Sequence, residues 1–304
     1  MPSMQLASLV EGAALPPAVV PLPVHRLKEW ELVELIAAGD DCEIHRARPA
    51  GAPANQPPAY AVKLLRSLRE HDCRAVALLR REAMVGRRIA NPHVVAVLSA
   101  SLREAPYFLV MPWLAGETLR TRLARSGVPP VHWSLWVVRQ IASGLAALDA
   151  QGWLHGDVKP DNVLVAPEGH VTLLDLGFAR RPGEVEPAAD DCVLGTAEYM
   201  APELLFSAMR SDIRSDLYSL GAVLYELLAG RPPFAGETRA ELVRQHKQAV
   251  PPRLDRVAPH VPGEVAALVH QMLAKDPLRR PQTPDELGDR LAKLEIFALR
   301  RWTA

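Results

Sequence analysis

The chain has 304 residues, of which 49% are hydrophobic and 23% charged, with 35 basic and 35 acidic side chains. This is the composition of a globular protein, and the length suits one large domain or two modest ones. A formal net charge of zero argues against a nucleic-acid-binding protein, which needs a basic surface. The three cysteines form no CxxC pair, so neither a disulfide framework nor a structural zinc site is expected.

No segment has the length and apolar character of a membrane span. The best candidate, 220–230, contains Glu226, and it is far shorter than the roughly 20 residues that a helix needs to cross a bilayer. The first residues lack a basic stretch followed by an apolar one, so no secretory signal is expected. We therefore expect a cytoplasmic protein that does not insert into membranes.

The periodicity of apolar residues divides the chain into a strand-rich part and a helical part. Residues 1–26 are rich in proline and are interpreted as a flexible leader, and 301–304 as a tail. One helix is predicted over 72–89, among strands over 30–37, 43–47, 60–65, 94–102 and 107–111. A hairpin over 162–175 interrupts a series of predicted helices over 118–126, 131–151, 215–230, 238–248, 262–274 and 284–298. The pattern predicts an α+β fold with two lobes, at about 27–111 and 112–300, and a cleft between them.

The residues that indicate chemistry gather in two loops next to the hairpin. Asp157, Lys159 and Asn162 stand in one loop, and Asp175 follows the second strand of the hairpin. Carboxylate and amide oxygens are ligands for Mg²⁺, and a lysine balances the charge of a phosphate. Asp157 is also placed to accept a proton from an attacking hydroxyl.

These residues belong to segments that resemble the eukaryotic-like Ser/Thr protein kinases of the type common in bacteria. The resemblance covers about 30–299, so 27–300 is interpreted as one protein kinase domain. It rests on motifs in the family's order: Tyr60-Ala61-Val62-Lys63, Glu82, His155-Gly156-Asp157, Asp175-Leu176-Gly177, Ala201-Pro202-Glu203, Asp216 and Arg280.

The resemblance implies transfer of the γ-phosphate of ATP to Ser/Thr hydroxyls of protein substrates, with Mg²⁺ as the metal and Mn²⁺ as a possible substitute. Asp157 would be the catalytic base and Lys159 the partner of the γ-phosphate. Thr196 would hydrogen-bond to both and favour Ser/Thr over Tyr acceptors.

The resemblance also assigns the groups that would hold the nucleotide and the metal. Lys63, positioned by Glu82, would bind the α- and β-phosphates, and Asn162 and Asp175 would hold the metal ion. Burial in the core is the alternative for the four residues that would form the apolar walls of the adenine site: Ile36, Ile44, Ala61 and Leu164.

Met111 would be the gatekeeper, and the hinge between the lobes would begin at Pro112. A proline has no N–H, but the first hinge position needs to offer only its carbonyl to adenine, and Leu114 would supply the N–H donor.

The chain departs from the family at its glycine-rich loop. Ala37, Gly39 and Cys42 occupy the three glycine positions, so only Gly39 is retained. Glycine serves there because the backbone must approach the phosphates closely. Asp40 and Asp41 add two carboxylates, which are unfavourable near a polyphosphate unless they point away from it.

A second departure is Gly156, where many protein kinases have an arginine that pairs with a phosphorylated activation loop. Residues 178–194 contain no Ser, Thr or Tyr. Both features predict that the enzyme does not need phosphorylation of this loop. No sensor domain is expected after the last helix, so regulatory input would come from elsewhere.

Two other functions stay open. The altered glycine loop favours a pseudokinase that serves as a nucleotide-binding scaffold. A His-Gly-Asp motif also occurs in small-molecule phosphotransferases of the aminoglycoside and choline kinase type. Lys159 and the segment 195–203, which resembles the peptide platform of Ser/Thr protein kinases, favour a protein substrate over a small molecule.

Overall fold

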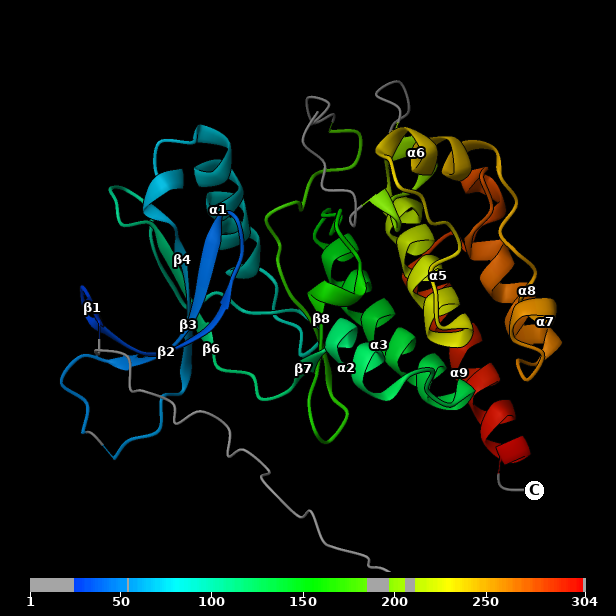
Figure 1. The fold of residues 1–304 in the computed structure, drawn as a ribbon, viewed down its shortest axis with the longest axis horizontal. Coiled ribbons are helices and arrows are strands. Elements are labelled where there is room, and N and C mark those ends of the chain that lie inside the picture. Colours follow the sequence, from blue (N-terminus) through cyan, green and yellow to red (C-terminus); the bar gives the residue numbers. More distant parts are fainter. Residues whose placement is uncertain (1–24, 54, 185–196, 206–210, 303–304) are drawn as a thin grey trace, which may run out of the picture.

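The computed structural model describes residues 25–53, 55–184, 197–205 and 211–302, which form two lobes (Figure 1). The smaller lobe is a curled antiparallel sheet with the strand order β1-β2-β3-β4-β6-β5. Its strands are β1 (His25–Leu27), β2 (Trp30–Ala38), β3 (Cys42–Pro49), β4 (Tyr60–Leu65), β5 (Ser99–Ser101) and β6 (Phe108–Pro112). The predicted α+β fold with two lobes is confirmed.

Helix α1 (Cys73–Gly86) packs on β4 and β6 of this sheet. It begins where the Asp72 side chain accepts hydrogen bonds from the backbone N–H groups of Arg74 and Ala75, which have no partner within the helix. Leu79 and Ala83 lie one turn apart and are buried. The same face carries Glu82, so packing of the helix fixes the position of this carboxylate.

The larger lobe is built around α5 (Ile213–Ala229), which is buried over nearly its whole length. Helix α3 (Val131–Ala150) packs against both α5 and α9 (Pro284–Trp302) (Figure 1). The other helices are α2 (Leu119–Ser126), α6 (Arg239–Gln248), α7 (Leu254–Val257) and α8 (Gly263–Met272). Within the described ranges, no helix is long and apolar enough to cross a bilayer.

A small antiparallel sheet in this lobe has the order β7-β8-β9 and faces the first lobe. It consists of β7 (Glu117–Thr118), β8 (Val163–Val165) and β9 (Val171–Leu173). The two loops with candidate catalytic residues precede β8 and follow β9. The β8–β9 hairpin therefore places both loops at the same end of the small sheet.

The prediction of a strand over 94–102 was wrong for most of its length. Only Ser99–Ser101 is a strand, whereas Val95 donates its N–H to Leu173 O and Val94 forms an isolated parallel bridge with Leu173. Val94 and Val95 are buried and pair with β9 of the larger lobe instead of with the sheet of the smaller lobe. Three short elements were not predicted from the sequence: β1, which begins inside the predicted leader, β7 and α7. Elements of this length are too short to show a periodic pattern of apolar residues.

His246 of α6 is buried against α5 and the segments that flank it. Its Nδ1 lies 2.9 Å from the Tyr218 hydroxyl, and its ring stands edge-on to Phe234 at 4.9 Å. Burial, aided by the nearby Lys275 ammonium, lowers the pKa of His246 to about 4. The imidazole is therefore neutral in the folded chain at a pH where an unfolded chain would bind a proton.

This difference predicts a loss of stability on acidification. Between about pH 6.5 and pH 4 the unfolded chain takes up a proton at His246 and the folded chain does not, so the free energy of unfolding falls as pH falls. The contribution is roughly 2–3 kcal/mol. Urea unfolding from pH 7 to pH 4 should show a shallower decline for His246→Gln than for the wild type. The exposed His260→Gln control should decline like the wild type, and equal slopes for all three proteins would contradict the prediction.

Candidate active site

The loop that carries Asp157 is held from below by Asp216 of α5. Both oxygens of the Asp216 carboxylate accept backbone hydrogen bonds, from His155 N at 2.7 Å and from Gly156 N at 2.9 Å. Burial raises the pKa of Asp216, which these N–H donors oppose. A fully buried carboxylate between two backbone donors fixes the height of the loop above α5.

His155 joins the same loop to the end of β9. Its Nε2 lies 3.0 Å from Leu174 O, and its Nδ1 lies 3.3 Å from Asp157 N. One neutral tautomer satisfies both contacts, with Nε2–H donating to the carbonyl and Nδ1 accepting from the amide. The imidazole thus links the backbone of Asp157 to the residue before Asp175.

Gly156 is the one residue of this loop whose backbone requires glycine. Its φ is +81°, and a Cβ placed on it would lie 2.5 Å from Phe178 O. Glycine therefore allows the chain after Asp175 to pass directly over the loop that carries Asp157. An arginine at this position would need a different path for one of the two segments.

The carboxylate of Asp157 is oriented by two donors from its own loop, the amide of Asn162 and the ammonium of Lys159. Its Oδ2 lies 2.8 Å from Asn162 Nδ2 and 2.9 Å from Lys159 Nζ. The carboxylate is buried, and its Oδ1 accepts no hydrogen bond from the described residues. One oxygen is thus fixed and the other is left available to accept a proton.

Lys63 of β4 lies between two carboxylates that come from different lobes. Its Nζ is 2.7 Å from Glu82 Oε2 of α1 and 3.1 Å from Asp175 Oδ1 after β9. Burial disfavours the ammonium, but Asp175 and Glu82 more than offset this effect, so the pKa of Lys63 is raised. Although burial opposes its ionisation, Lys63 holds the pKa of Asp175 below the usual range. Burial raises the pKa of Glu82 to about 7, so the Lys63 ammonium and the Asp175 carboxylate are the ion pair that joins the two lobes.

The residues expected to hold a metal ion provide a suitable donor set. Asp175 has φ +58°, and its Oδ1 accepts from Gly177 N at 3.2 Å, so its Oδ2 is left without a donor among the described residues. Asn162 uses its Nδ2 on Asp157, which leaves its Oδ1 free to act as a ligand. Leu174 N donates to Asn162 O at 2.9 Å and brings the two loops together. A carboxylate and an amide oxygen suit Mg²⁺, although the described residues contain no group of three or more His, Cys, Asp or Glu placed to bind a metal.

The residues expected around adenine lie on strands that line the lobe boundary. Ala61 of β4 and Met111 of β6 are register partners, and both are buried. Leu164 is half-buried on β8, below them. After Pro112, Trp113 N–H pairs with Ala59 O, whereas no described residue accepts the N–H of Leu114.

Three further residues assigned to the nucleotide lie on the β2–β3 hairpin. Ile44 of β3 is half-buried and is the register partner of Lys63. Ile36 is 42% exposed beside an irregularity in the pairing of β2 with β3. Gly39, at the tip, donates its N–H to Cys42 O at 2.9 Å. Thr196, which the family resemblance places next to Asp157, lies outside the described residues.

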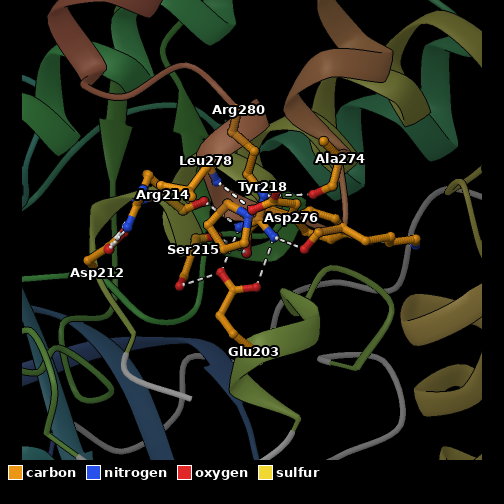
Figure 2. Close-up of polar contacts among 12 residues, drawn as sticks. Glu203, Asp212, Arg214, Ser215, Tyr218, Ala274, Asp276, Leu278 and Arg280 are labelled. Atoms are coloured by element: carbon orange, nitrogen blue, oxygen red, sulfur yellow. Dashed lines mark hydrogen bonds and ion pairs between the residues drawn. The ribbon is translucent and has the colours of Figure 1, made fainter.

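Glu203, which ends the activation segment (175–203), forms a buried ion pair with Arg280 (Figure 2). The guanidinium donates to both carboxylate oxygens, at 2.6 and 2.8 Å, and Ser215 Oγ adds a hydrogen bond of 2.7 Å to Glu203. Arg280 also donates to the carbonyls of Ala274 and Arg214. All partners of this buried cation are therefore supplied by protein, as such burial demands.

The structure adds ion pairs that sequence reasoning did not identify. Arg81 of α1 contacts Glu184, which follows the Asp175 loop, at 3.0 Å. Arg120 of α2 contacts Glu226 at 2.7 Å and the Tyr199 hydroxyl at 2.6 Å. Each pair joins segments far apart in the sequence, and no local spacing indicates such contacts.

Comparison with known proteins agrees with this arrangement. The protein kinase domain family matches residues 51–290. The chain belongs to this family, and to its bacterial-type, eukaryotic-like Ser/Thr branch. The match begins after the β2–β3 hairpin, which carries the altered glycine loop.

Curated bacterial proteins are similar to the chain over most of its length. Serine/threonine-protein kinase pkn2 of Myxococcus xanthus is 38% identical over 76% of this chain and 29% of its own length. PknL of Mycobacterium tuberculosis is 34% identical over 86% of this chain and 64% of its own. The probable serine/threonine-protein kinase CPE1738 of Clostridium perfringens is 31% identical over 88% of this chain and 38% of its own length. The chain thus spans less than two thirds of the length of these relatives.

Loss of the Arg280 guanidinium should destabilise the larger lobe. Arg280→Ala leaves Glu203 buried without its counter-ion, which costs about 3–5 kcal/mol. Arg253→Ala removes an arginine from an exposed pair with Asp255, which solvent screens, so it should leave stability nearly unchanged. Urea unfolding measures both, and an Arg280→Ala protein as stable as the Arg253→Ala control would contradict the prediction.

Proposed function

We propose that the chain is a Ser/Thr protein kinase that transfers the γ-phosphate of Mg·ATP to hydroxyl groups of protein substrates. The observation that supports this most is the orientation of Asp157. One oxygen of its carboxylate is held by Asn162 and Lys159, and the other accepts no hydrogen bond from the described residues. A base that is fixed on one side and open on the other suits the deprotonation of a bound hydroxyl.

In the proposed reaction, the substrate hydroxyl binds at the open oxygen of Asp157. As the hydroxyl oxygen forms its bond to the γ-phosphorus, its proton passes to Asp157, and the bond from that phosphorus to the β-phosphate oxygen breaks. ADP leaves with the electron pair of that bond. Lys159, already beside Asp157, contributes positive charge next to the transferred group.

Lys63 is assigned to the α- and β-phosphates. Its ammonium is held by Glu82 and Asp175 before any nucleotide arrives, so little reorganisation is needed on binding. Asn162 and Asp175 would hold the Mg²⁺, which supplies neutralisation of the phosphate charge when bound. Ala61, Met111 and Leu164 offer apolar surface for adenine, and the N–H of Leu114 offers a donor.

The proposal includes activity without phosphorylation of the activation segment. Gly156 leaves no cation at this position to bind a phosphate, and residues 178–194 have no hydroxyl group to phosphorylate. The ion pair of Arg81 with Glu184 joins α1 to the start of this segment. A carboxylate of the chain itself thus holds α1, the helix that carries Glu82.

The proposal is tested with purified protein, Mg²⁺, γ-labelled ATP and a mixture of generic protein acceptors. Asp157→Asn removes the base and Lys63→Met removes the phosphate partner, so each should lower the rate of labelling at least about 100-fold. Circular dichroism should show that each variant is folded. Asp255→Asn, an exposed aspartate of the larger lobe, is the matched control and should keep full activity.

The outcomes separate the alternative functions. Label on Ser and Thr that is lost in Asp157→Asn supports a protein kinase. A rise in melting temperature with ATP but no transfer would overturn the proposal in favour of a nucleotide-binding pseudokinase. Transfer to a small-molecule hydroxyl, with none to protein, would favour a small-molecule phosphotransferase.

A further inference from the structure

The tip of the β2–β3 hairpin, residues 39–41, has a composition that the proposed function does not explain. This tip corresponds to the loop that would cover the phosphates of ATP, yet it has one glycine and two neighbouring carboxylates, Asp40 and Asp41. Carboxylates next to a triphosphate weaken binding unless their charge is neutralised or directed away. The inference below rests on the proposed nucleotide site.

The hairpin tip lies beside the Lys63 cluster. Cys42 follows the tip directly and is half-buried, and Ile44 two residues later is the register partner of Lys63. Burial raises the pKa of the Cys42 thiol to about 11, and the charges of Lys63, Glu82 and Asp175 all act on this sulfur. A charge on the tip therefore acts on phosphates bound at Lys63.

The Asp41 carboxylate is directed to an arginine on the segment between β4 and α1. Arg69 Nε donates to Asp41 Oδ1 at 2.7 Å. The same guanidinium contacts Asp72 Oδ2 at 2.9 Å through Nη2. Because Asp72 caps α1, Arg69 also joins the hairpin tip to the helix that carries Glu82.

The backbone of the tip is held from the same segment. Arg66 N donates to Asp41 O at 2.9 Å, and Arg66 Nη1 donates to Gly39 O at 3.1 Å. These bonds fix the tip whether or not Arg69 is present. The Arg69 guanidinium is thus the cation that pairs with the Asp41 carboxylate.

We propose that Arg69 is a positioning residue for ATP: it neutralises Asp41 and turns this carboxylate away from the phosphates, which allows a tip with a single glycine to accept a triphosphate. Arg69 itself contacts no nucleotide. Its effect is on charge, so it should depend on the phosphates of the ligand and on the presence of Asp41.

The test compares the binding of ATP, ADP and adenosine, with Mg²⁺ and at low ionic strength, by isothermal titration calorimetry. Arg69→Ala leaves the Asp41 charge without its counter-ion and should weaken the binding of ATP and of ADP about three- to tenfold. Adenosine, which has no phosphate, should bind as it does to the wild type. The loss for ATP should shrink in 0.5 M salt, because salt screens an exposed charge.

Removing Asp41 provides the decisive comparison. Asp41→Asn alone should not weaken the binding of ATP. The Asp41→Asn/Arg69→Ala double variant should bind ATP as tightly as the wild type does. Arg253→Ala, which breaks a similar exposed Arg–Asp pair in the other lobe, is the matched control and should leave all three affinities unchanged.

Three results would overturn the inference: unchanged ATP affinity in Arg69→Ala, an equal loss for adenosine, or no recovery in the double variant. The last two would mean that Arg69 acts through the shape of the hairpin. A wild-type chain that binds no nucleotide would overturn the proposed function as well. A wild type that transfers phosphate while Arg69→Ala binds ATP normally would overturn the inference alone.

Discussion

The ammonium of Lys63 is the point on which the arrangement of the two lobes depends. It contacts Glu82 on one side and Asp175 on the other, and these carboxylates come from different lobes. The ammonium and the Glu82 carboxylate are largely removed from bulk water, so each depends on an opposite charge to offset its desolvation, and the single ammonium serves both carboxylates. Movement of α1, or of the loop after β9, would leave a charge without its partner. The position of Lys63, which the proposed function assigns to the phosphates of ATP, is therefore coupled to the placement of one lobe against the other.

In the larger lobe, two buried carboxylates hold the loops of the site in place, one by accepting backbone hydrogen bonds and the other by pairing with an arginine. Asp216 supports the loop before Asp157, and Glu203 pairs with Arg280 at the end of the activation segment. Gly156 lets Phe178 O approach the loop of Asp157 directly. These contacts are built from the chain itself, and together they hold the loops of the site without a phosphate group.

Much of the candidate site could be predicted because its residues are close in sequence. Asp157, Lys159 and Asn162 belong to one loop, and a short hairpin returns the chain to Asp175, so spacing alone brings these groups together. The direction in which a flexible side chain points could not be predicted from the sequence. Sequence shows that Asp41 adds a charge to the hairpin tip, but only the structure shows Arg69 beside it. The strand predicted over 94–102 failed for a related reason, since the buried Val94 and Val95 pair through their backbones with Leu173 of the other lobe.

The most direct test of this account is to remove all phosphate from the purified protein and then to measure its initial rate of phosphoryl transfer. Phosphatase treatment, followed by measurement of intact mass, provides the starting material. If the contacts of the chain itself assemble the site, Ser/Thr acceptors should be labelled from the first minute, without a lag, and no label should appear with Asp157→Asn. Transfer that begins only after the chain has become phosphorylated, or that continues at the same rate in the variant, would contradict the account.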